Sequence, residues 1–247
     1  SNHIPLAMRW PKGIRGQNRV IDDFINFTDL APTFLQAAGI IDPAPVMQPI
    51  SGRSMFDIFE SNLSGQIDPG RNRVIVGKER HDIGRPNDWG YPIRGTLTKE
   101  CLYLHNFETE RWPAGNPETG YLNCDGSPMK TQILDMRRKG ENQTWWQLSF
   151  GKRPAEEFYQ VSRDEDCVHN LAESQNLTNT KNRLRDLMIL DLKNHGDPRM
   201  FANGEVFDTY PYFDKRTAHF FERFKSGEKM NAGWVNQSDF EELSIAE

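Results

Sequence analysis

The sequence predicts an α/β fold, and two observations support this prediction. Short apolar or alternating segments bounded by turn residues indicate strands, and the first of them runs from Ile4 to Trp10 and ends at Pro11. In other segments the apolar residues recur every three or four positions, as on one face of an amphipathic helix. Both kinds of segment occur along the 247 residues, a length that can bury a sizeable core.

The first helix is predicted to begin at Phe27 and to end at Ala38. Its apolar face would consist of Phe27, Leu30, Ala31, Phe34, Leu35 and Ala38. Thr28 can cap its start, and Gly39 can end it. A second, short helix is expected from Ser54 to Glu60.

Strands are predicted in three later segments: Arg73 to Gly77, Cys101 to Phe107 and Glu157 to Val161. A helix with Leu184, Leu187, Met188 and Leu192 on one face follows them and stops near Gly196. Residues 108–150 contain Pro, Gly and Asn throughout, so we expect a long ordered excursion without a compact element. No element is assigned to residues 199–247.

Composition excludes several classes of function. The net charge of −5 provides no overall positive field, so nucleic acid is not an expected partner. No run of about 18 apolar residues is present, so no membrane span is expected. Cys101, Cys124 and Cys167 lack zinc-site spacing, which leaves one disulfide and one free thiol possible.

Six segments in order resemble the C-terminal half of type I sulfatases, which belong to the alkaline phosphatase superfamily. They read IPLAMRWPKGIRG, DDFINFTDLAPTFLQAAGI, SGRSMFDIF, VIVGKERHD, YPIRGTLTKECLYLHNF and EEFYQVSRDEDCVHNLAE. The triplet Glu79, Arg80 and His81, followed by Tyr91 and Arg94, looks most like the N-sulfoglucosamine sulfohydrolase (heparan N-sulfatase) branch.

This resemblance implies a domain organisation and an activity. Residues 1–65 would end a mixed-sheet catalytic domain, residues 66–198 would form a small antiparallel sheet with a helix, and residues 199–247 would be an extension. Enzymes of this family hydrolyse sulfate esters or sulfamates on glycosaminoglycan sugars of the heparan type. They use calcium and a formylglycine made from the first residue of a C/S-x-P-x-R motif.

The chain lacks that catalytic set. None of its cysteines or serines opens C/S-x-P-x-R, and it contains no Asp-Asn step to match the family's calcium ligands. The pair Asp22 and Asp23 precedes a predicted helix and is interpreted as helix-terminus carboxylates. We therefore expect no catalytic residue and no metal ligand here, with calcium and formylglycine belonging to the full-length enzyme.

Substrate recognition is the role that this half can contribute. Arginine forks match the geometry of sulfate oxygens, and histidine can hydrogen-bond a sugar hydroxyl or a sulfamate. The predicted substrate-binding residues come from the densest basic stretch and from one residue near the N-terminus: Glu79, Arg80, His81, Arg85, Arg94 and His3. The alternative for the stretch is a solvated charged loop, with Glu79 and Arg80 paired to each other.

Other functions remain open from the sequence. The chain could belong to a phosphatase or phosphodiesterase of the same superfamily, or it could be an inert fragment or a sugar-binding module. Its first strand and helix would expose apolar faces, so we expect a partner, either the N-terminal half of the enzyme or a second copy. Alone the chain is predicted to be inactive. The family implies a periplasmic, secreted or lysosomal location.

Overall fold

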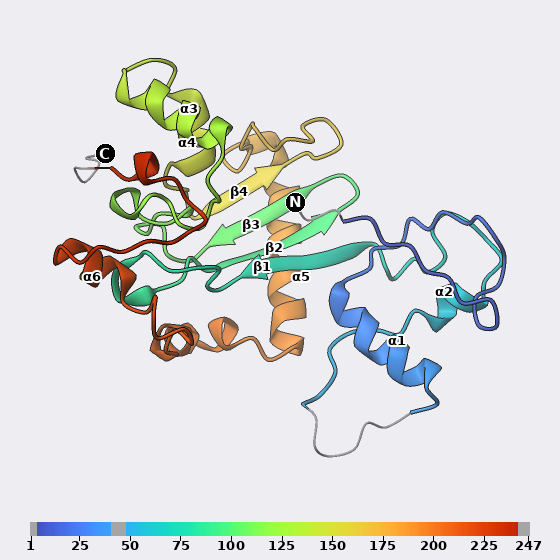
Figure 1. The fold of residues 1–247 in the computed structure, drawn as a ribbon. Helices are drawn as coiled ribbons and strands as arrows, with labels where there is room; N and C mark the ends of the chain where they lie inside the picture. The colour runs from blue at the N-terminus through green and yellow to red at the C-terminus, as the bar shows by residue number, and fades with distance from the viewer. Residues whose placement is uncertain (1–3, 41–47, 242–247) are drawn as a thin grey trace.

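A four-stranded antiparallel sheet forms the centre of the molecule (Figure 1). The computed structural model describes residues 4–40 and 48–241. The strands are β1 (Arg73–Lys78), β2 (Ile93–Thr98), β3 (Leu102–Asn106) and β4 (Glu156–Tyr159), and they lie in the order β1-β2-β3-β4. With the helices around the sheet, this architecture confirms the predicted α/β class.

Helix α5 (Thr178–Asn194) covers one face of this sheet (Figure 1). Tyr103 pairs with Phe158 across β3 and β4, and neither side chain is exposed to solvent. Both pack with Leu184, Met188 and Leu192 of α5. Each such buried side chain contributes roughly 1.5 to 3 kcal/mol. The predicted helix stop is also confirmed, because Gly196 follows α5 with a left-handed φ of 70°.

The segment before β1 holds a short 3-10 helix, η1 (Phe27–Asp29), followed by α1 (Leu30–Ala37) and α2 (Phe56–Glu60). The two predicted helices are thus confirmed, but the cap is Asn26 and not Thr28. Asn26 Oδ1 accepts the backbone N–H of Thr28 at 3.0 Å, and Asp29 Oδ2 accepts the N–H of Asn26 at 3.2 Å. This reciprocal pair is a capping box.

The strand predicted from Ile4 to Trp10 does not form. No strand within residues 4–40 and 48–241 lies beside this segment, so its backbone has no ladder to join. Ile4 and Leu6 are exposed, whereas Met8 and Trp10 pack against the buried cluster around Phe59. The apolar pattern therefore correctly indicated that part of this segment packs against the core, but the segment is not a strand.

Asp23 has a different role from the one predicted. It is buried, and its two oxygens accept the backbone N–H groups of Ile67 and Asp68, each at 2.7 Å. Asp23 therefore ties the segment before η1 to the linker before β1, and it does not act at a helix terminus. Asp22 next to it is exposed.

Residues 108–150 contain two helices that the sequence analysis did not expect, α3 (Pro128–Arg138) and α4 (Thr144–Phe150). Ser127 Oγ accepts the N–H of Lys130 at 3.1 Å, and Pro128 occupies the first helical turn. A serine cap followed by proline is a helix-start signal that could have been recognised.

Residues 198–241 consist of short helices that run along the loops of the sheet domain. Their bounds are η5 (Pro198–Phe201), η6 (Gly204–Thr209), α6 (Phe220–Lys225) and η7 (Gln237–Asp239), and the remaining 3-10 turns are η2 (Pro86–Asp88), η3 (Pro117–Thr119) and η4 (Gln175–Leu177). Asp239 is fully buried beside α3, where its Oδ1 accepts the hydroxyl of Thr131 at 2.8 Å.

The three cysteines are free thiols, which excludes the disulfide that the sequence left open. Cys101 is buried, and burial raises the pKa of its thiol. In the part of the chain that the structure describes, no helix combines the length and the apolar character needed to cross a bilayer.

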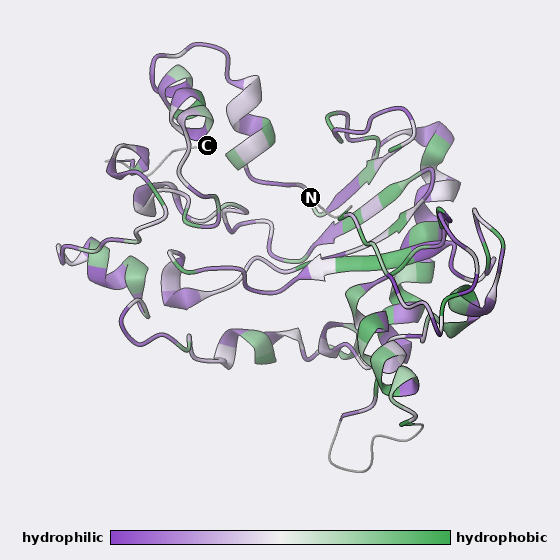
Figure 2. Cartoon of the chain, turned by 45° about the vertical axis from the view of Figure 1, so that its right-hand side comes forward, coloured by the Kyte–Doolittle hydropathy of each residue, from purple (hydrophilic) through white to green (hydrophobic). Residues whose placement is uncertain are grey.

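The apolar face of α1 is open to solvent. Figure 2 shows α1 as largely hydrophobic, yet Thr33 is its only buried residue. Phe34 is 62% exposed, and Phe27 just before the helix is 60% exposed. Contiguous exposed apolar surface is characteristic of interaction sites.

Replacing Phe34 by Asp should leave the free energy of unfolding of this chain within about 0.5 kcal/mol of the parent, because the side chain has little to lose on the surface. The same change should reduce self-association at high concentration. Urea unfolding and sedimentation velocity measure the two effects. Phe59→Asp serves as the contrasting variant, since Phe59 is buried. A large stability loss in Phe34→Asp would contradict an open α1 face.

Candidate functional site

The loop between β1 and β2, residues 79–92, carries four of the six predicted substrate-binding residues, and a fifth, Arg94, lies near the start of β2. Its two ends lie together because Lys78 pairs with Ile93 in the sheet. Gly90 packs so closely on the other end that an added Cβ would lie 2.4 Å from the carbonyl oxygen of Glu79. The loop is therefore a compact structure on the end of the hairpin, and loops of this length are commonly functional.

Glu79 and Arg94 bind each other at the base of this loop. Arg94 Nη2 lies 2.5 Å from Glu79 Oε1, and Arg94 Nε lies 2.5 Å from Asp197 Oδ2. Arg199 adds a fork to Glu79, with Nε 2.7 Å from Oε1 and Nη2 2.8 Å from Oε2. We call these four residues the base network. Both predicted residues are engaged inside the protein, and their contact with substrate stays a prediction.

Arg80 is also held by the protein. Its guanidinium donates to the carbonyl oxygens of Asp88 and Tyr210, each at 3.1 Å, and of Pro211 at 3.2 Å. It also lies 5.6 Å from the centre of the Tyr212 ring. Arg80 thus joins the loop to the C-terminal extension. The alternative interpretation had Arg80 paired with Glu79, and the structure does not form that pair.

Arg85 is an arginine buried without a carboxylate. Only 1% of it is exposed, and it donates to the carbonyl oxygens of Trp112 at 2.8 Å and Pro113 at 2.9 Å. Its Nη1 has no hydrogen-bond partner. Burial, together with the charge of Arg111, lowers the pKa of Arg85 to about 10. Buried charges are almost always paired, and within the described residues Arg85 has backbone carbonyl acceptors but no ion-pair partner.

Lys78 adds a second cation to this position. Its Nζ lies 6.0 Å from the centre of the Tyr91 ring, and Arg85 Cζ lies 5.9 Å from the same point. Burial and then the charge of Arg85 lower the pKa of Lys78. Within the described residues no carboxylate forms an ion pair with either cation, although the charge of Asp82 acts on Arg85. Lys78 is not among the substrate-binding residues that the sequence predicted.

His81 is the most exposed of the predicted residues in this loop. It lies on the loop surface next to Asp82. Burial raises the pKa of Asp82, although the N–H of Ile83 and the charges of His81 and Arg85 oppose this rise. His3 lies outside the described residues, so its proximity to this loop stays a prediction.

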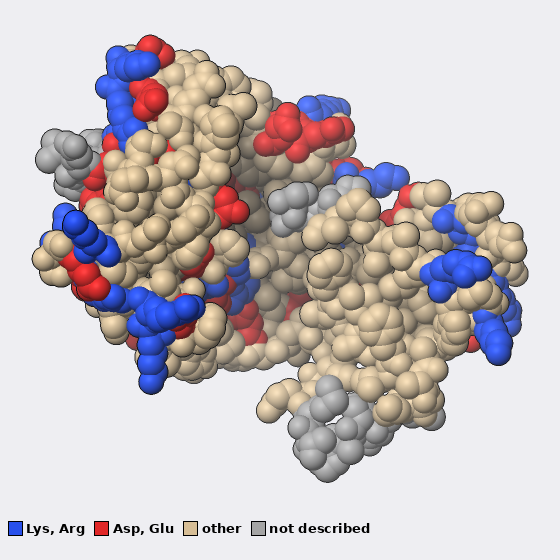
Figure 3. Space-filling model, in the orientation of Figure 1, with Lys and Arg blue, Asp and Glu red and all other residues tan. Residues whose placement is uncertain are grey.

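The arrangement suits the binding of a singly or doubly charged oxyanion. Two cations face one ring without an acidic partner, and a buried N–H group of Arg85 is unsatisfied. Sulfate and phosphate oxygens accept such charge-assisted hydrogen bonds. Figure 3 shows side chains of both signs at the bottom of the hollow between the part that carries α6 and the part that carries α1.

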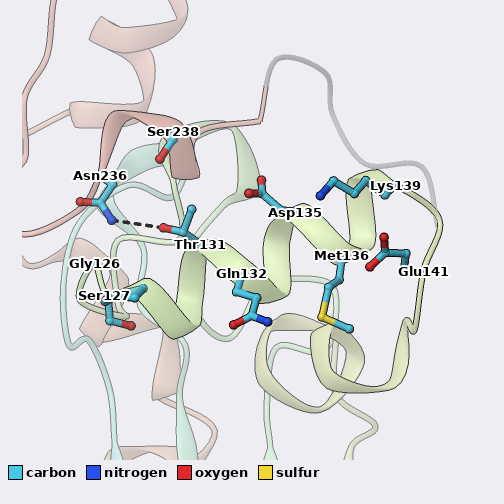
Figure 4. A pocket seen from close by; sticks show the side chains of 11 residues that line it. Gly126, Ser127, Thr131, Gln132, Asp135, Met136, Lys139, Glu141, Asn236 and Ser238 are labelled. Carbon is cyan, nitrogen blue, oxygen red and sulfur yellow. Dashed lines mark hydrogen bonds between the residues drawn. The ribbon is translucent and has the colours of Figure 1, made fainter.

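A separate hollow lies along α3 and does not include this loop (Figure 4). Thr131, Asp135 and Lys139 line it together with Asn236, which donates to Thr131 at 3.2 Å. Its lining carries one cation, Lys139, and two carboxylates, Asp135 and Glu141, and none of its cations is buried and unsatisfied. It lacks the chemistry that the loop provides.

Residues for a nucleophile or a metal site are not brought together. Among residues 4–40 and 48–241 no group of three His, Cys, Asp or Glu side chains could hold a metal ion. Burial raises the pKa of the Cys124 and Cys167 thiols, which opposes formation of a reactive thiolate.

Comparisons with known proteins give two sequence matches. Residues 1–69 match the family model described as N-sulphoglucosamine sulphohydrolase, C-terminal. An ulvan-active sulfatase from Formosa agariphila is 25% identical over 194 residues, which cover 78% of this chain and 34% of that protein. The chain thus spans about a third of the length of that relative.

Two solved structures share a distant likeness. One is a protein in complex with its substrate D-glucosamine-2-N,6-O-disulfate, with 16% identity, a TM-score of 0.41 and coverage of 68% of this chain and 24% of that chain. The other is a putative sulfatase from Bacteroides thetaiotaomicron, with 16% identity, a TM-score of 0.39 and coverage of 69% and 25%. No residue role is transferred from them.

The raised pKa of Asp82 leads to a prediction with a defined sign. A carboxyl whose folded pKa is raised stabilises the fold at low pH and loses that contribution as the pH rises through its folded pKa. Asp82→Asn should therefore raise the stability near pH 7 relative to the parent, and the gain should vanish near pH 3. Urea unfolding at both pH values measures it.

Asp214→Asn is the matched control for this prediction. Hydrogen bonds from Arg216 lower the pKa of Asp214, so its substitution should act in the opposite direction near pH 7. Equal effects of the two substitutions would contradict the assignment of Asp82 to a partly buried position beside the cations.

Proposed function

The resemblance to the C-terminal region of sulfatases is confirmed, and from it we propose that this chain is the substrate-recognition part of a larger enzyme. That enzyme hydrolyses sulfate esters or sulfamates on glycosaminoglycan sugars of the heparan type. Its nucleophile lies in an N-terminal part outside this chain. The family model matched by residues 1–69 supports the heparan type of substrate.

The unpaired cations Lys78 and Arg85 carry this proposal. An arginine that is 1% exposed and has a free N–H group loses hydration without gaining an ion pair. A sulfate group bound beside it would supply the missing charge and the missing acceptor. Among the described residues, the charge of the Asp82 carboxylate acts on Arg85 but forms no ion pair with it, so a ligand anion would supply the missing partner.

His81 completes the proposed contact surface. It lies on the outside of the loop that holds Arg85, where an imidazole can donate to or accept from a sugar hydroxyl or a sulfamate. This surface is supported by contacts within the protein that Glu79, Arg80 and Arg94 make. A hydrogen bond from any of the three to the sugar would add to this supporting role.

Calcium and formylglycine belong to the part of the enzyme outside this chain. The described residues do not fit a calcium site, because they contain no cluster of carboxylates free for a metal and Asp23 is occupied by two backbone N–H groups. When bound elsewhere in the enzyme, calcium would supply charge to hold the sulfate that is cleaved.

The exposed face of α1 is where we propose that the N-terminal part packs. Phe27 and Phe34 present an apolar surface that residues 4–40 and 48–241 leave exposed, and residues up to about 65 would complete the catalytic domain. Self-association through the same face is the expected behaviour when that part is absent. A location outside the cytoplasm follows from the family relationship alone.

The full-length protein tests the activity. It is expected to release sulfate from an N-sulfated or O-sulfated glucosamine disaccharide, and to act at least about a hundredfold less efficiently on a phosphate monoester of the same sugar. Sulfate and phosphate release are measured by ion chromatography. Preferential phosphate release would instead assign the protein to the phosphatase alternative, and binding of the disaccharide without release would indicate a sugar-binding module.

Replacing Lys78 by Met in the full-length enzyme should raise KM about ten- to a hundredfold, because a hydrogen bond to a charged group contributes roughly 1.5 to 3 kcal/mol. Arg85→Lys should raise KM in the same direction, since lysine keeps the charge but loses the fork. Lys139→Met on α3 is the control and should leave KM within about twofold. An unchanged KM in Lys78→Met would contradict the proposal that the substrate binds beside Lys78 and the loop.

A further inference from the structure

Arg199 lies far along the chain from the loop 79–92 but is bound to its first residue. Both oxygens of Glu79 accept from the Arg199 guanidinium, at 2.7 and 2.8 Å. Arg199 is largely buried, with 6% of its side chain exposed. Its Cζ also lies 5.1 Å from the ring centre of Phe107 and 5.5 Å from that of Phe207. The two parallel hydrogen bonds of such a buried bidentate pair fix the orientation of both side chains.

The other end of the loop is held by the same group of residues. Arg94 follows Ile93 at the start of β2 and binds Glu79 with Nη2 and Asp197 with Nε. Asp197 in turn accepts the backbone N–H of Arg199 at 2.9 Å. The base network thus connects the end of β1, the start of β2 and the turn after α5. It contains two positive and two negative groups, so it has no charge to offer a substrate anion.

We propose that Arg199 is a positioning residue that acts through Glu79 to orient the sulfate-recognition loop. This inference rests on the proposed function and deepens it. Glu79 precedes Arg80 and His81 directly, so a rotation at Glu79 moves both. The loop also contains consecutive left-handed residues, Asn87 and Asp88, with φ of 56° and 55°. Such a backbone keeps its shape only when its surroundings hold it.

The C-terminal extension contributes further contacts that maintain this conformation. Asp88 Oδ2 accepts the backbone N–H of His219 at 2.7 Å, and Glu222 Oε1 accepts the N–H of Asn87 at 2.7 Å. Arg199 is where this extension begins. The extension therefore clamps the loop at its base through Arg199 and at its tip through α6.

Arg73 provides a matched comparison at the opposite end of β1. It forms a bidentate pair with Asp191 of α5, at 2.8 and 2.9 Å. This pair also joins β1 to the α5 region, but it lies a strand length away from the loop. A residue that only holds α5 against the sheet should behave like Arg73.

The experiment compares Arg199→Met, Arg199→Lys and Arg73→Met in the full-length protein. Hydrogen exchange of residues 79–92 is measured relative to that of β3, and KM and kcat are measured with an N-sulfated glucosamine disaccharide. Arg199→Met should speed loop exchange about tenfold while β3 is unchanged. It should raise KM about tenfold or more with a smaller effect on kcat, because a displacement of about 1 Å weakens binding. Arg199→Lys should recover part of both effects.

Arg73→Met should leave loop exchange and KM within about twofold of the parent. Loop exchange that is unchanged in both Arg199 variants, or that rises equally in Arg73→Met, overturns the positioning role. The positioning role is also overturned if Arg199→Met speeds hydrogen exchange of the loop but leaves KM unchanged. A parent enzyme without sulfate release overturns the proposed function instead, and the exchange comparison then still decides whether Arg199 holds the loop.

Discussion

The pair of Glu79 with two buried arginines determines how the rest of the recognition surface is built. Arg94 approaches it from β2 and Arg199 approaches from the turn after α5, so one carboxylate connects three parts of the chain. Removing Arg199 would leave Glu79 with Arg94 as its remaining partner, so the carboxylate would stay charged but would be held less firmly. The loop 79–92 has its orientation because both of its ends are attached to this network.

The basic residues of this region therefore fall into two groups with different roles. Arginines that are paired, such as Arg94 and Arg199, define geometry, whereas Lys78 and Arg85 remain without an acidic partner. These two cations without an ion pair both lie near the Tyr91 ring, in a protein whose net charge is −5. Local charge, and not the overall field, attracts the anion.

Periodicity in the sequence predicted the elements whose packing is simple. The repeat of Leu184, Met188 and Leu192 identified α5, and the alternation in Cys101 to Phe107 identified β3. Strand β2 was missed because Arg94 and Gly95 interrupt its apolar pattern. Ile4 to Trp10 was assigned as a strand because local hydrophobicity does not reveal whether a pairing strand is present.

The site was predictable only as a stretch of sequence. The resemblance directed attention to residues 79–94, and the structure places residues 79–92 in one loop and Arg94 in β2. Sequence alone could not separate the paired arginines from the unpaired ones, because the partners of Glu79 and Arg80 lie about 120 to 130 positions away. The role of Lys78 depends equally on the position of Tyr91 and on the absence of a nearby carboxylate among the described residues.

The most direct measurement of the central claim is a crystal structure of the full-length protein soaked with an N-sulfated glucosamine disaccharide that is not turned over. The account predicts a sulfate group within hydrogen-bonding distance of Arg85 Nη1 and Lys78 Nζ, with His81 against the sugar and Glu79 still bound to Arg199. A disaccharide bound elsewhere, with Arg85 Nη1 satisfied by a group of the protein itself, would contradict it.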